Sequence, residues 1–530
     1  MTRSSWSISG FNSPPPPSGV PRPPPPRFQK LPSKPSSCST SLRITFASRF
    51  HRDNMLTIAD AIEALTNIRP SASTVITEAV IDSRQIIPGS MFVAIPGEKA
   101  DGHDYIGEAF KRGASFALTQ RDAAADASFR TLDLRSLPSA ESISATDLST
   151  PLCLRVENTV TALQQIARFW RRKMEVRVVG VTGSVGKSTT KEMIAEVLTT
   201  RYRTLKSPGN LNNEIGLPLT LLRLSHGHQR AVMEMGFYVP GEIAFLCDIA
   251  LPQVGVVTNV GTVHAERAGS QEAIARGKAE LVQALPPAPE GVAILNFDDA
   301  WVRKMEEKTK ARVFFYGLSH EAHLWADQVE GLGLDGIRFR IHYQGETLHV
   351  KIPLIGRHSV HTALRAAAVG LAEGMNWQEI LEGLSQGHTQ LRLAAVRSEN
   401  GALLLDDTYN ASPESMLAAL NLLDELDGRK IAVLGDMLEL GPYERGGHEM
   451  VGLRAAQVAG VLLTLGERAR IIAEAARRAG MKKSSVLEFE QLEPIVEWLN
   501  TNLSPNDVVL IKGSHGLRMD RITNLLEVRS

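Results

Sequence analysis

The chain has 530 residues, of which 43% are apolar, and its 58 lysines and arginines balance its 58 aspartates and glutamates. This length predicts about three domains of roughly 150 residues each, and the zero net charge argues against a nucleic-acid-binding surface or an acidic tail. The three cysteines have no paired spacing, which argues against a disulfide framework or a thiolate metal site and favours a reducing compartment. No apolar run reaches the roughly 18 residues that a membrane-spanning helix needs.

The first 54 residues differ in composition from the rest. They contain proline runs at residues 14–17 and 23–26, many serines, eight lysines and arginines, and no acidic residue before Asp53. Such a segment cannot bury enough apolar surface to fold, and its composition is typical of an organelle transit peptide. A polyproline linker or recognition arm is the alternative. We therefore predict that residues 1–54 are a disordered transit peptide and that the globular part begins at Met55.

Residues 55–173 are predicted to form a mixed α/β N-terminal domain. Strands are expected at residues 79–84 and 90–95, followed by a helix near residues 105–112. Residues 122–150 are rich in loop-forming residues and only weakly patterned, so no element is predicted there.

The segment that follows, residues 176–190, is the most informative of the chain. A β-branched strand leads into the turn Thr182-Gly-Ser-Val-Gly-Lys-Ser188, and a helix is expected from about residue 189 to 198. In such a turn successive N–H groups form an anion site, the lysine neutralises β- and γ-phosphate charge, and the serine hydroxyl can hold Mg²⁺. Val181 stands where the strict phosphate-loop pattern has a small residue, so this is a variant form. The pattern predicts a nucleoside triphosphate site.

Residues 174–390 alternate strands and helices, which predicts a parallel sheet with helices on its faces. Buried strands are expected at residues 232–235, 254–258 and 292–295. Strand hairpins are expected over residues 320–353 and two helices over residues 358–386.

The alternation restarts in residues 391–530, with strands expected at residues 403–405, 431–434, 461–465 and 508–511. This pattern predicts a separate, doubly wound domain of the Rossmann type. Three domains leave clefts between them, and clefts are where ligands bind. The predicted fold class is thus α/β, with a mixed α/β N-terminal domain, a central P-loop ATPase-like parallel sheet and a C-terminal Rossmann-like domain.

Further motifs occur in a fixed order around the phosphate loop. They are Asp82-Ser-Arg84, the segment 88–97, Asp101-Gly-His103, the segment 210–218, Glu234-Met-Gly236, Thr258-Asn259, His264, Lys278-Ala-Glu280, the segment 406–410 and the segment 435–441. This series resembles the Mur ligases of peptidoglycan synthesis, and the resemblance covers the chain from Met55 to the C-terminus. Single motifs of this kind are modest evidence, whereas ten in order are strong.

The resemblance implies an ATP-dependent ligase that joins a carboxylate to an amine through an acyl phosphate. The branch of the family that it fits best adds D-alanyl-D-alanine to UDP-N-acetylmuramoyl-tripeptide, with ATP and Mg²⁺ as cofactors. We expect no nucleic-acid partner and a monomer. With a transit peptide, the resemblance suits the chloroplast stroma of a plastid better than a mitochondrion, and the cytoplasm is the alternative.

The resemblance also implies roles for individual residues. The catalytic residues would be Lys187, Glu234, His264, Lys278, Arg392 and Asp407. The nucleotide would be bound by Thr182, Gly183, Ser184, Val185, Gly186, Lys187, Ser188, Thr189, Asn296, Thr362, Arg392, Asp407, Tyr409 and Asn410. The UDP-linked substrate would contact Ser83, Arg84, Gly102, His103, Asn210, Asn212 and Asn213. Metal ions would be held by Ser188, Glu234, His264 and a carbamoylated Lys278.

The chain departs from the family pattern at the helix that follows the hairpins. Ser359 and Thr362 stand where the family has amides that contact the nucleotide. A hydroxyl keeps hydrogen bonding but loses the paired donor and acceptor of an amide. One lost neutral contact costs about 0.5–1.5 kcal/mol, at most about a tenfold loss of ATP affinity. The departure predicts a weaker enzyme and not a silent one.

Three alternative functions remain open. The sister ligase that adds the third amino acid carries Asp-Asn-Pro-Arg, which does not occur in this sequence. A catalytically weak paralogue acting as a scaffold or regulatory binding protein is favoured by Ser359 and Thr362 but opposed by the intact Lys187 and Glu234. A switch GTPase would require an Asn-Lys-x-Asp motif for reading the base, and the chain has none.

Overall fold

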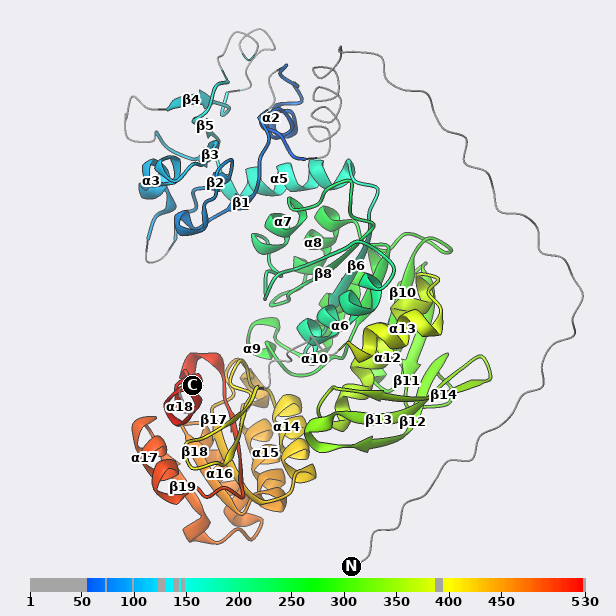
Figure 1. Ribbon diagram of the computed structural model, residues 1–530, viewed down its shortest axis with the longest axis vertical. Coiled ribbons are helices and arrows are strands. Elements are labelled where there is room, and N and C mark those ends of the chain that lie inside the picture. The colour runs from blue at the N-terminus through cyan, green and yellow to red at the C-terminus, as the bar shows by residue number, and fades with distance from the viewer. Residues whose placement is uncertain are drawn as a thin grey trace, which may run out of the picture. The chain divides into compact units, whose positions relative to one another are not determined.

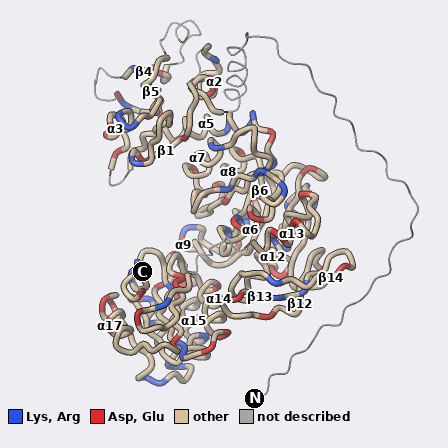
Figure 2. The backbone as a smooth tube through the Cα atoms, viewed as in Figure 1, with Lys and Arg blue, Asp and Glu red and all other residues tan. Residues whose placement is uncertain are grey.

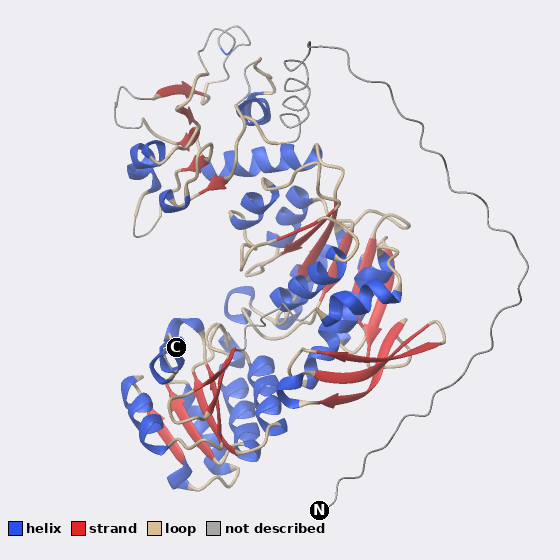
Figure 3. Cartoon of the chain, in the orientation of Figure 1, coloured by secondary structure: helices blue, strands red, loops and turns tan. Residues whose placement is uncertain are grey.

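The computed structural model describes residues 55–71, 74–97, 100–122, 129–136, 143, 148–386 and 394–527. The predicted transit peptide and Arg392 lie outside this described part. Its chain forms three β-sheets, each flanked by helices (Figures 1 and 3). Charges of both signs are dispersed along all of them (Figure 2). Among the described helices, none combines the length and apolar character needed to cross a bilayer.

The first sheet is parallel throughout and has the strand order β1-β2-β3-β5-β4. Its strands are β1 (Ala79–Val80), β2 (Met91–Val93), β3 (Phe116–Thr119), β4 (Arg130–Asp133) and β5 (Leu152–Arg155). The helices of this region are α2 (Ile58–Thr66), α3 (Ile106–Lys111) and α5 (Thr159–Arg172).

Two expectations for this region were wrong in part. The strand expected over residues 79–84 ends at Val80, because the Asp82 side chain accepts a hydrogen bond from the Arg84 N–H (3.0 Å) and starts a 3₁₀ turn. Strand β4 lies within residues 122–150, where no element was predicted. Its Arg130 and Thr131 are exposed, so the strand lacks the continuous apolar run by which its neighbour β5 is recognised.

The central sheet has nine strands in the order β14-β13-β12-β11-β10-β9-β6-β8-β7. They are β6 (Arg177–Thr182), β7 (Thr204–Lys206), β8 (Arg230–Glu234), β9 (Val254–Val257), β10 (Val292–Asn296), β11 (Arg312–Gly317), β12 (Leu324–Gly331), β13 (Ile337–Tyr343) and β14 (Glu346–Ile352). All neighbours are parallel except the β12–β13 and β13–β14 pairs, which are the hairpins predicted over residues 320–353. The helices are α6 (Lys187–Thr199), α7 (Gly216–Leu221), α8 (Glu242–Ala250), α9 (Ala265–Ala268), α10 (Gln271–Gln283), α11 (Ala300–Arg303), α12 (Val360–Ala372) and α13 (Trp377–Ser385).

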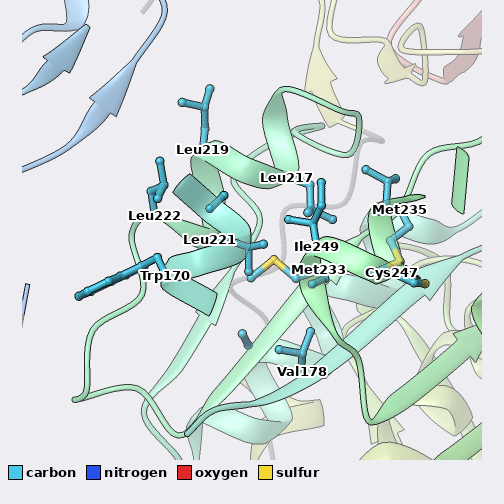
Figure 4. Close-up of a cluster of buried hydrophobic side chains, with 14 of the residues drawn as sticks. Trp170, Val178, Leu217, Leu219, Leu221, Leu222, Met233, Met235, Cys247 and Ile249 are labelled. Carbon is cyan, nitrogen blue, oxygen red and sulfur yellow. Dashed lines mark hydrogen bonds between the residues drawn. The ribbon is translucent and has the colours of Figure 1, made fainter. Parts of the chain in front are cut away.

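The inner strands of the central sheet, such as β9 and β10, are buried on both faces, which explains why they are apolar almost throughout, whereas the hairpin strands β12 to β14 alternate exposed and buried residues. Along β6, Val178 belongs to one hydrophobic core and Val179 to the other. Figure 4 shows the first core, where Trp170 of α5 and Leu217 of α7 lie near Met233 of β8. The Trp170 indole also donates to the Leu224 carbonyl (3.0 Å), so α5 ties the first sheet's region to the central one.

The third sheet has six strands in the order β15-β16-β20-β17-β18-β19, parallel except for the edge strand β15. The strands are β15 (Ala394–Arg397), β16 (Leu403–Asp406), β17 (Arg429–Gly435), β18 (Val461–Leu465), β19 (Val486–Phe489) and β20 (Asp507–Lys512). The helices are α14 (Pro413–Glu425), α15 (Glu444–Val458), α16 (Ala469–Arg478), α17 (Glu493–Asn502) and α18 (Asp520–Leu526). This arrangement confirms the predicted doubly wound fold. The edge strands β15 and β19 were not predicted, because half-exposed edge strands carry a weaker apolar pattern.

Candidate nucleotide site

A cavity of about 480 Å³ opens at the carboxyl ends of the central strands and extends to the loop after β16. Most of the predicted nucleotide and metal residues line it. They are Ser184, Val185, Gly186, Lys187, Ser188, Thr189, Glu234, His264, Asn296, Thr362, Asp407, Tyr409 and Asn410. The carboxyl edge of a parallel sheet is where such ligands bind, so the strand prediction and the motif prediction meet at one place.

The phosphate loop joins β6 to α6 and is held by the end of β9. Ser184 N–H donates to the Asn259 carbonyl (3.0 Å), and Val185 N–H donates to the Asn259 side chain (2.9 Å). A Cβ on Gly183 would lie 1.8 Å from Thr258 Oγ1, so only glycine fits there. The first turn of α6 follows the loop directly, and such a helix start is the usual place for an anion.

Two of the predicted nucleotide residues lie beneath the loop and do not line the cavity. Thr182 is fully buried, and its hydroxyl donates to the Met235 carbonyl (3.0 Å). Gly183 packs against Thr258. Both residues therefore shape the loop from below. Lys187 folds back over the loop, and its Nζ lies 2.9 Å from the Gly183 carbonyl.

Glu234, at the end of β8, is 1% exposed and fully hydrogen-bonded on both oxygens. Ser188 Oγ donates to its Oε2 (2.6 Å), and Asn212 Nδ2 donates to its Oε1 (2.9 Å). The Lys191 ammonium lies 4.0 Å away and also donates to two main-chain carbonyls. A buried carboxylate needs such partners, and the pair Ser188–Glu234 brings two oxygen donors of the kind that Mg²⁺ prefers to one point.

His264 follows β9 in a left-handed conformation (φ 67°). Its Nδ1 lies 2.6 Å from Glu439 Oε2, and the Tyr238 ring meets the imidazole edge-on at 4.7 Å between centroids. Burial lowers the pKa of His264, and the positive charges of Lys187 and Lys278 act in the same direction, against Glu439. Glu439 was missed as a site residue. Glu439 lies 175 residues after His264 in the chain, and the only feature of the sequence that pointed to it was its place in the motif 435–441.

Lys278, on α10, is 1% exposed and lies behind the cavity wall. Its Nζ is 4.8 Å from the centre of the Phe237 ring. The pKa of Lys278 lies well below its usual range, mainly because the side chain is buried and also because of the positive charge of Lys187. Lys278 is therefore not a solvated surface lysine. Among the described residues no group of three or more His, Cys, Asp or Glu side chains is placed to hold a metal ion.

A second part of the cavity wall, next to the phosphate loop, belongs to α12 and the turn before it; we call Ser359, His361, Thr362 and Arg365 the α12 side. Ser359 Oγ donates to the Ile355 carbonyl (2.8 Å), so this hydroxyl is already engaged. Arg365 Nη2 donates to Thr362 Oγ1 (3.3 Å). The sequence reasoning missed Arg365, although it is the one charged residue in the apolar run 362–372.

The loop after β16 brings the C-terminal residues to the cavity. Asp407 Oδ2 accepts a hydrogen bond from Lys512 Nζ (2.7 Å), and the same ammonium donates to the Asn410 carbonyl (2.9 Å). Lys512 is 2% exposed, so it fixes the loop from below. Tyr409 and Asn410 follow on the cavity rim. Arg392, predicted beside them, lies outside the described residues.

The predicted substrate residues fall into two groups. Asn210 and Asn212 line the cavity, whereas the Asn213 side chain accepts a hydrogen bond from the N–H of Gly216 (2.8 Å), the first residue of α7. The other group belongs to the first sheet's region and lies apart from the cavity: Ser83, Arg84, Gly102 and His103. Arg84 is exposed and pairs with Asp82 (2.7 Å), so its guanidinium is accessible to an anion.

His103 is more constrained than the sequence implied. Its Nδ1 lies 2.6 Å from Asp101, and its Nε2 accepts from the Gln120 N–H (3.0 Å), so both ring nitrogens are in use. A Cβ on Gly102 would lie 2.7 Å from the Ile95 nitrogen, which explains the glycine by close packing. These contacts make the two residues supports of the loop that follows β2.

Family models and relatives agree with this geometry. The model of the Mur ligase family, catalytic domain, matches residues 75–171, the Mur ligase middle domain matches residues 181–370, and the Mur ligase, glutamate ligase domain, matches residues 391–515. The UDP-N-acetylmuramoyl-tripeptide–D-alanyl-D-alanine ligase of Bacillus subtilis is 34% identical over 453 residues, covering 85% of this chain and 93% of the relative. The protein of that name from Synechocystis is 36% identical over 84% of this chain and 90% of the relative.

Solved structures are similar over the same span. The crystal structure of MurF from Acinetobacter baumannii has a TM-score of 0.74 at 28% identity and covers 89% of this chain and 98% of its own. The MurF ligase from Thermotoga maritima in complex with ADP has a TM-score of 0.70 at 28% identity, covering 87% of this chain and 97% of its own. By its motifs, its fold and these relatives, the chain belongs to the Mur ligase family.

Proposed function

We propose that this chain is the ADP-forming ligase that joins D-alanyl-D-alanine to UDP-N-acetylmuramoyl-tripeptide in peptidoglycan precursor synthesis. Relatives of that name are 32–36% identical to it over most of their length. The observation that carries the proposal is the cavity itself, in which the phosphate loop, the buried Glu234 and the Asp407 loop converge. Convergence of these three elements is what transfer of a phosphoryl group to a bound carboxylate requires.

The chemistry proceeds in two steps. The γ-phosphoryl group of ATP moves to the carboxylate of the tripeptide, which gives an acyl phosphate and ADP. The dipeptide amine then attacks the acyl carbon, and phosphate leaves as the amide forms. Lys187 and the first-turn N–H groups of α6 stabilise the charge of the transferred group, and the loop of Asp407 and Tyr409 shields the acyl phosphate from water.

Magnesium fits the residues on the phosphate-loop side. Ser188 Oγ and Glu234 Oε2 are both oxygen donors, lie 2.6 Å apart and line the cavity, which are the donor chemistry and the placement that Mg²⁺ requires beside β- and γ-phosphates. When bound, the ion neutralises charge on the phosphate oxygens. Glu439, by holding Nδ1 of His264, leaves Nε2 as the ring nitrogen for a second ion.

We further propose that Lys278 is carbamoylated. Burial lowers the pKa of its Nζ well below the usual range, which favours the neutral amine, the form that attacks carbon dioxide. In that reaction the ammonium first loses one proton to give the amine, the amine nitrogen bonds to the carbon of carbon dioxide, and a second proton is released as the anionic carbamate forms. The change of sign removes the repulsion from Lys187 that the unmodified ammonium would feel in a buried place.

The nucleotide-sugar substrate is proposed to span two regions. Asn210 and Asn212 offer amide donors at the cavity, and the exposed Arg84 offers a planar fork suited to a diphosphate. Ser83, Gly102 and His103 would then shape this diphosphate end.

Release of ADP from ATP, measured with UDP-N-acetylmuramoyl-tripeptide in the presence and absence of D-alanyl-D-alanine, tests the function. Turnover that requires the dipeptide is expected, and mass spectrometry should find the pentapeptide product. A second reaction distinguishes the sister ligase: diaminopimelate replaces D-alanyl-D-alanine, and the UDP-linked dipeptide replaces the UDP-linked tripeptide as acceptor. Turnover only in that arrangement would refute the proposal.

A second function has one observation in its favour. The α12 side lacks the amides of the family, and Ser359 is engaged by the main chain, which suits a catalytically weak paralogue acting as a scaffold or regulatory binding protein. Nucleotide binding without dipeptide-dependent turnover would support this reading.

For localisation we propose import into a plastid, with residues 1–54 as the transit peptide. The support is their composition: proline runs, eight basic residues and no acidic residue before Asp53. A fluorescent protein fused after residues 1–54 should enter the organelle, whereas a fusion that starts at Met55 should stay cytosolic. Diffuse fluorescence from the leader fusion would contradict the proposal.

A further inference from the structure

Arg365, on α12, is a buried cation with an incomplete set of partners. It is 5% exposed and lines the nucleotide cavity. Its Nε donates to the His361 carbonyl (2.8 Å) and its Nη2 to Thr362 Oγ1 (3.3 Å), but Nη1 has no hydrogen-bond partner among the described residues. Its electrostatic partner is the ring of Tyr316, 5.8 Å from the guanidinium carbon, and not a carboxylate.

Arg171 shows how this chain satisfies an arginine whose role is structural. It is equally buried, at 4% exposed, and lies on α5 away from the cavity. Its Nε, Nη1 and Nη2 all donate to main-chain carbonyls, at 2.7–2.9 Å for the shortest bond of each nitrogen. Each nitrogen of Arg171 thus has an acceptor, whereas Nη1 of Arg365 has none within the described residues. A buried charge that lacks partners is strongly unfavourable, so we expect Arg365 to acquire an acceptor from a ligand.

The position of Arg365 identifies the missing partner. A Cβ built on Gly186 would lie 3.5 Å from Nη1, so the guanidinium sits directly against the residue that precedes Lys187. Burial lowers the pKa of His361 to about 4, and the charge of Arg365 acts in the same direction, whereas Asp298 opposes it. The unpartnered Nη1 beside the phosphate loop therefore favours an anion.

We propose that Arg365 recognises the phosphate chain of the bound nucleotide, as a second cation beside Lys187. The inference rests on the proposed use of ATP. A nucleobase offers only neutral acceptors, whereas a phosphate both accepts the hydrogen bonds and neutralises the charge. Arg365 lies one helical turn after Thr362, so it supplies affinity at the place where the family's amide is missing.

The test is the binding of ADP to the full chain, by titration calorimetry with Mg²⁺ and neither tripeptide nor dipeptide present. Arg365→Met is expected to raise the Kd for ADP by about 10- to 100-fold. It should also make the dependence of that Kd on KCl concentration shallower, because a charge–charge contact is screened by salt. Arg365→Lys keeps the charge but loses the planar fork of the guanidinium, so its Kd for ADP should lie between those of the wild type and Arg365→Met.

Thermal unfolding without nucleotide separates this role from a structural one. Removing an uncompensated buried charge should leave the Tm of Arg365→Met unchanged or raised, whereas Arg171→Met should lower the Tm and leave the Kd for ADP unchanged. Arg312→Met, an exposed change at the amino end of β11, controls for loss of surface charge.

Two results would overturn the proposal: a Kd for ADP within about twofold of the wild type, or a weaker Kd whose salt dependence is unchanged, which would assign Arg365 to the base. If Arg365→Met does not fold, the same two criteria apply to Arg365→Lys. Because no ligase substrate is present, failure of the proposed function would appear in the ADP-release assay and not in this one.

Discussion

The two walls of the nucleotide cavity differ in how they treat buried charge. On the phosphate-loop side, formed by residues 184–189 and Glu234, the acid is matched by Ser188, Asn212 and Lys191. On the α12 side, Arg365 Nη1 and His361 Nδ1 have no hydrogen-bond partner in the part of the chain that the structure describes. The first wall is complete in itself, whereas the second acquires its partners from a ligand. A buried polar group without a partner therefore marks a place where a ligand is expected to bind.

The phosphate-loop side should carry the chemistry, so its loss should be the most severe. Lys187→Ala is expected to reduce dipeptide-dependent ADP release by at least about 10²–10³-fold, because no other group replaces its charge on the transferred phosphoryl. Lys351→Ala, an exposed change on β14, is the matched control. Retention of turnover by Lys187→Ala would show that the phosphate loop is misassigned and would remove the contrast between the walls.

Lys278, on α10, does not line the cavity, and its loss should have a smaller effect than the loss of Lys187. Lys278→Ala is expected to lower turnover by about 10–100-fold, and formate or acetate should restore part of it by occupying the place of the carbamate. Bicarbonate labelled with ¹³C should give a carbamate signal in the wild type that Lys278→Ala lacks. Absence of both rescue and signal would leave Lys278 as an unmodified buried lysine.

The sequence was sufficient where the determinants are local. The strand, turn and helix of the phosphate loop and the strand that ends at Glu234 are each encoded in a few consecutive residues, and the structure confirms these elements. It was insufficient where partners meet across the fold. Glu439 reaches His264 from 175 residues away, and only the packing of α12 against Gly186 reveals Arg365. Short or exposed strands such as β1 and β4 were mistaken because their patterns are brief.

The acid sensitivity of the α12 side follows from His361. Its pKa of about 4 lies below the ordinary value of 6.5, because burial and then Arg365 disfavour its charged form, while Asp298 opposes and His358 adds to the effect. The folded state thus binds fewer protons than the unfolded state between these values. The associated stability is complete above pH 6.5 and is lost as the pH falls towards 4, amounting to at most about 3 kcal/mol.

His361→Gln should therefore show a smaller fall in Tm between pH 7 and pH 4.5 than the wild type. His349→Gln, an exposed change on β14, should behave as the wild type and accounts for the carboxylates that titrate in every variant. Equal falls in all three proteins would mean that His361 is not held neutral by its surroundings.

The smallest effect concerns the amide that the α12 side has lost. Thr362→Asn restores an amide at the cavity, and we expect it to lower the KM for ATP by up to about tenfold with little change in kcat, since one neutral hydrogen bond is worth about 0.5–1.5 kcal/mol. The decrease in the KM for ATP should be larger in the Arg365→Met background than in the wild type. In the wild type Arg365 Nη2 donates a hydrogen bond to the Thr362 hydroxyl, so an asparagine at position 362 would have to share this donor with the nucleotide. Steady-state kinetics of the two single variants and the double variant measure this coupling. Strict additivity would mean that the amide and the guanidinium contact separate parts of the nucleotide. The two would then be independent contacts, and Arg365 would not be a replacement for the missing amide.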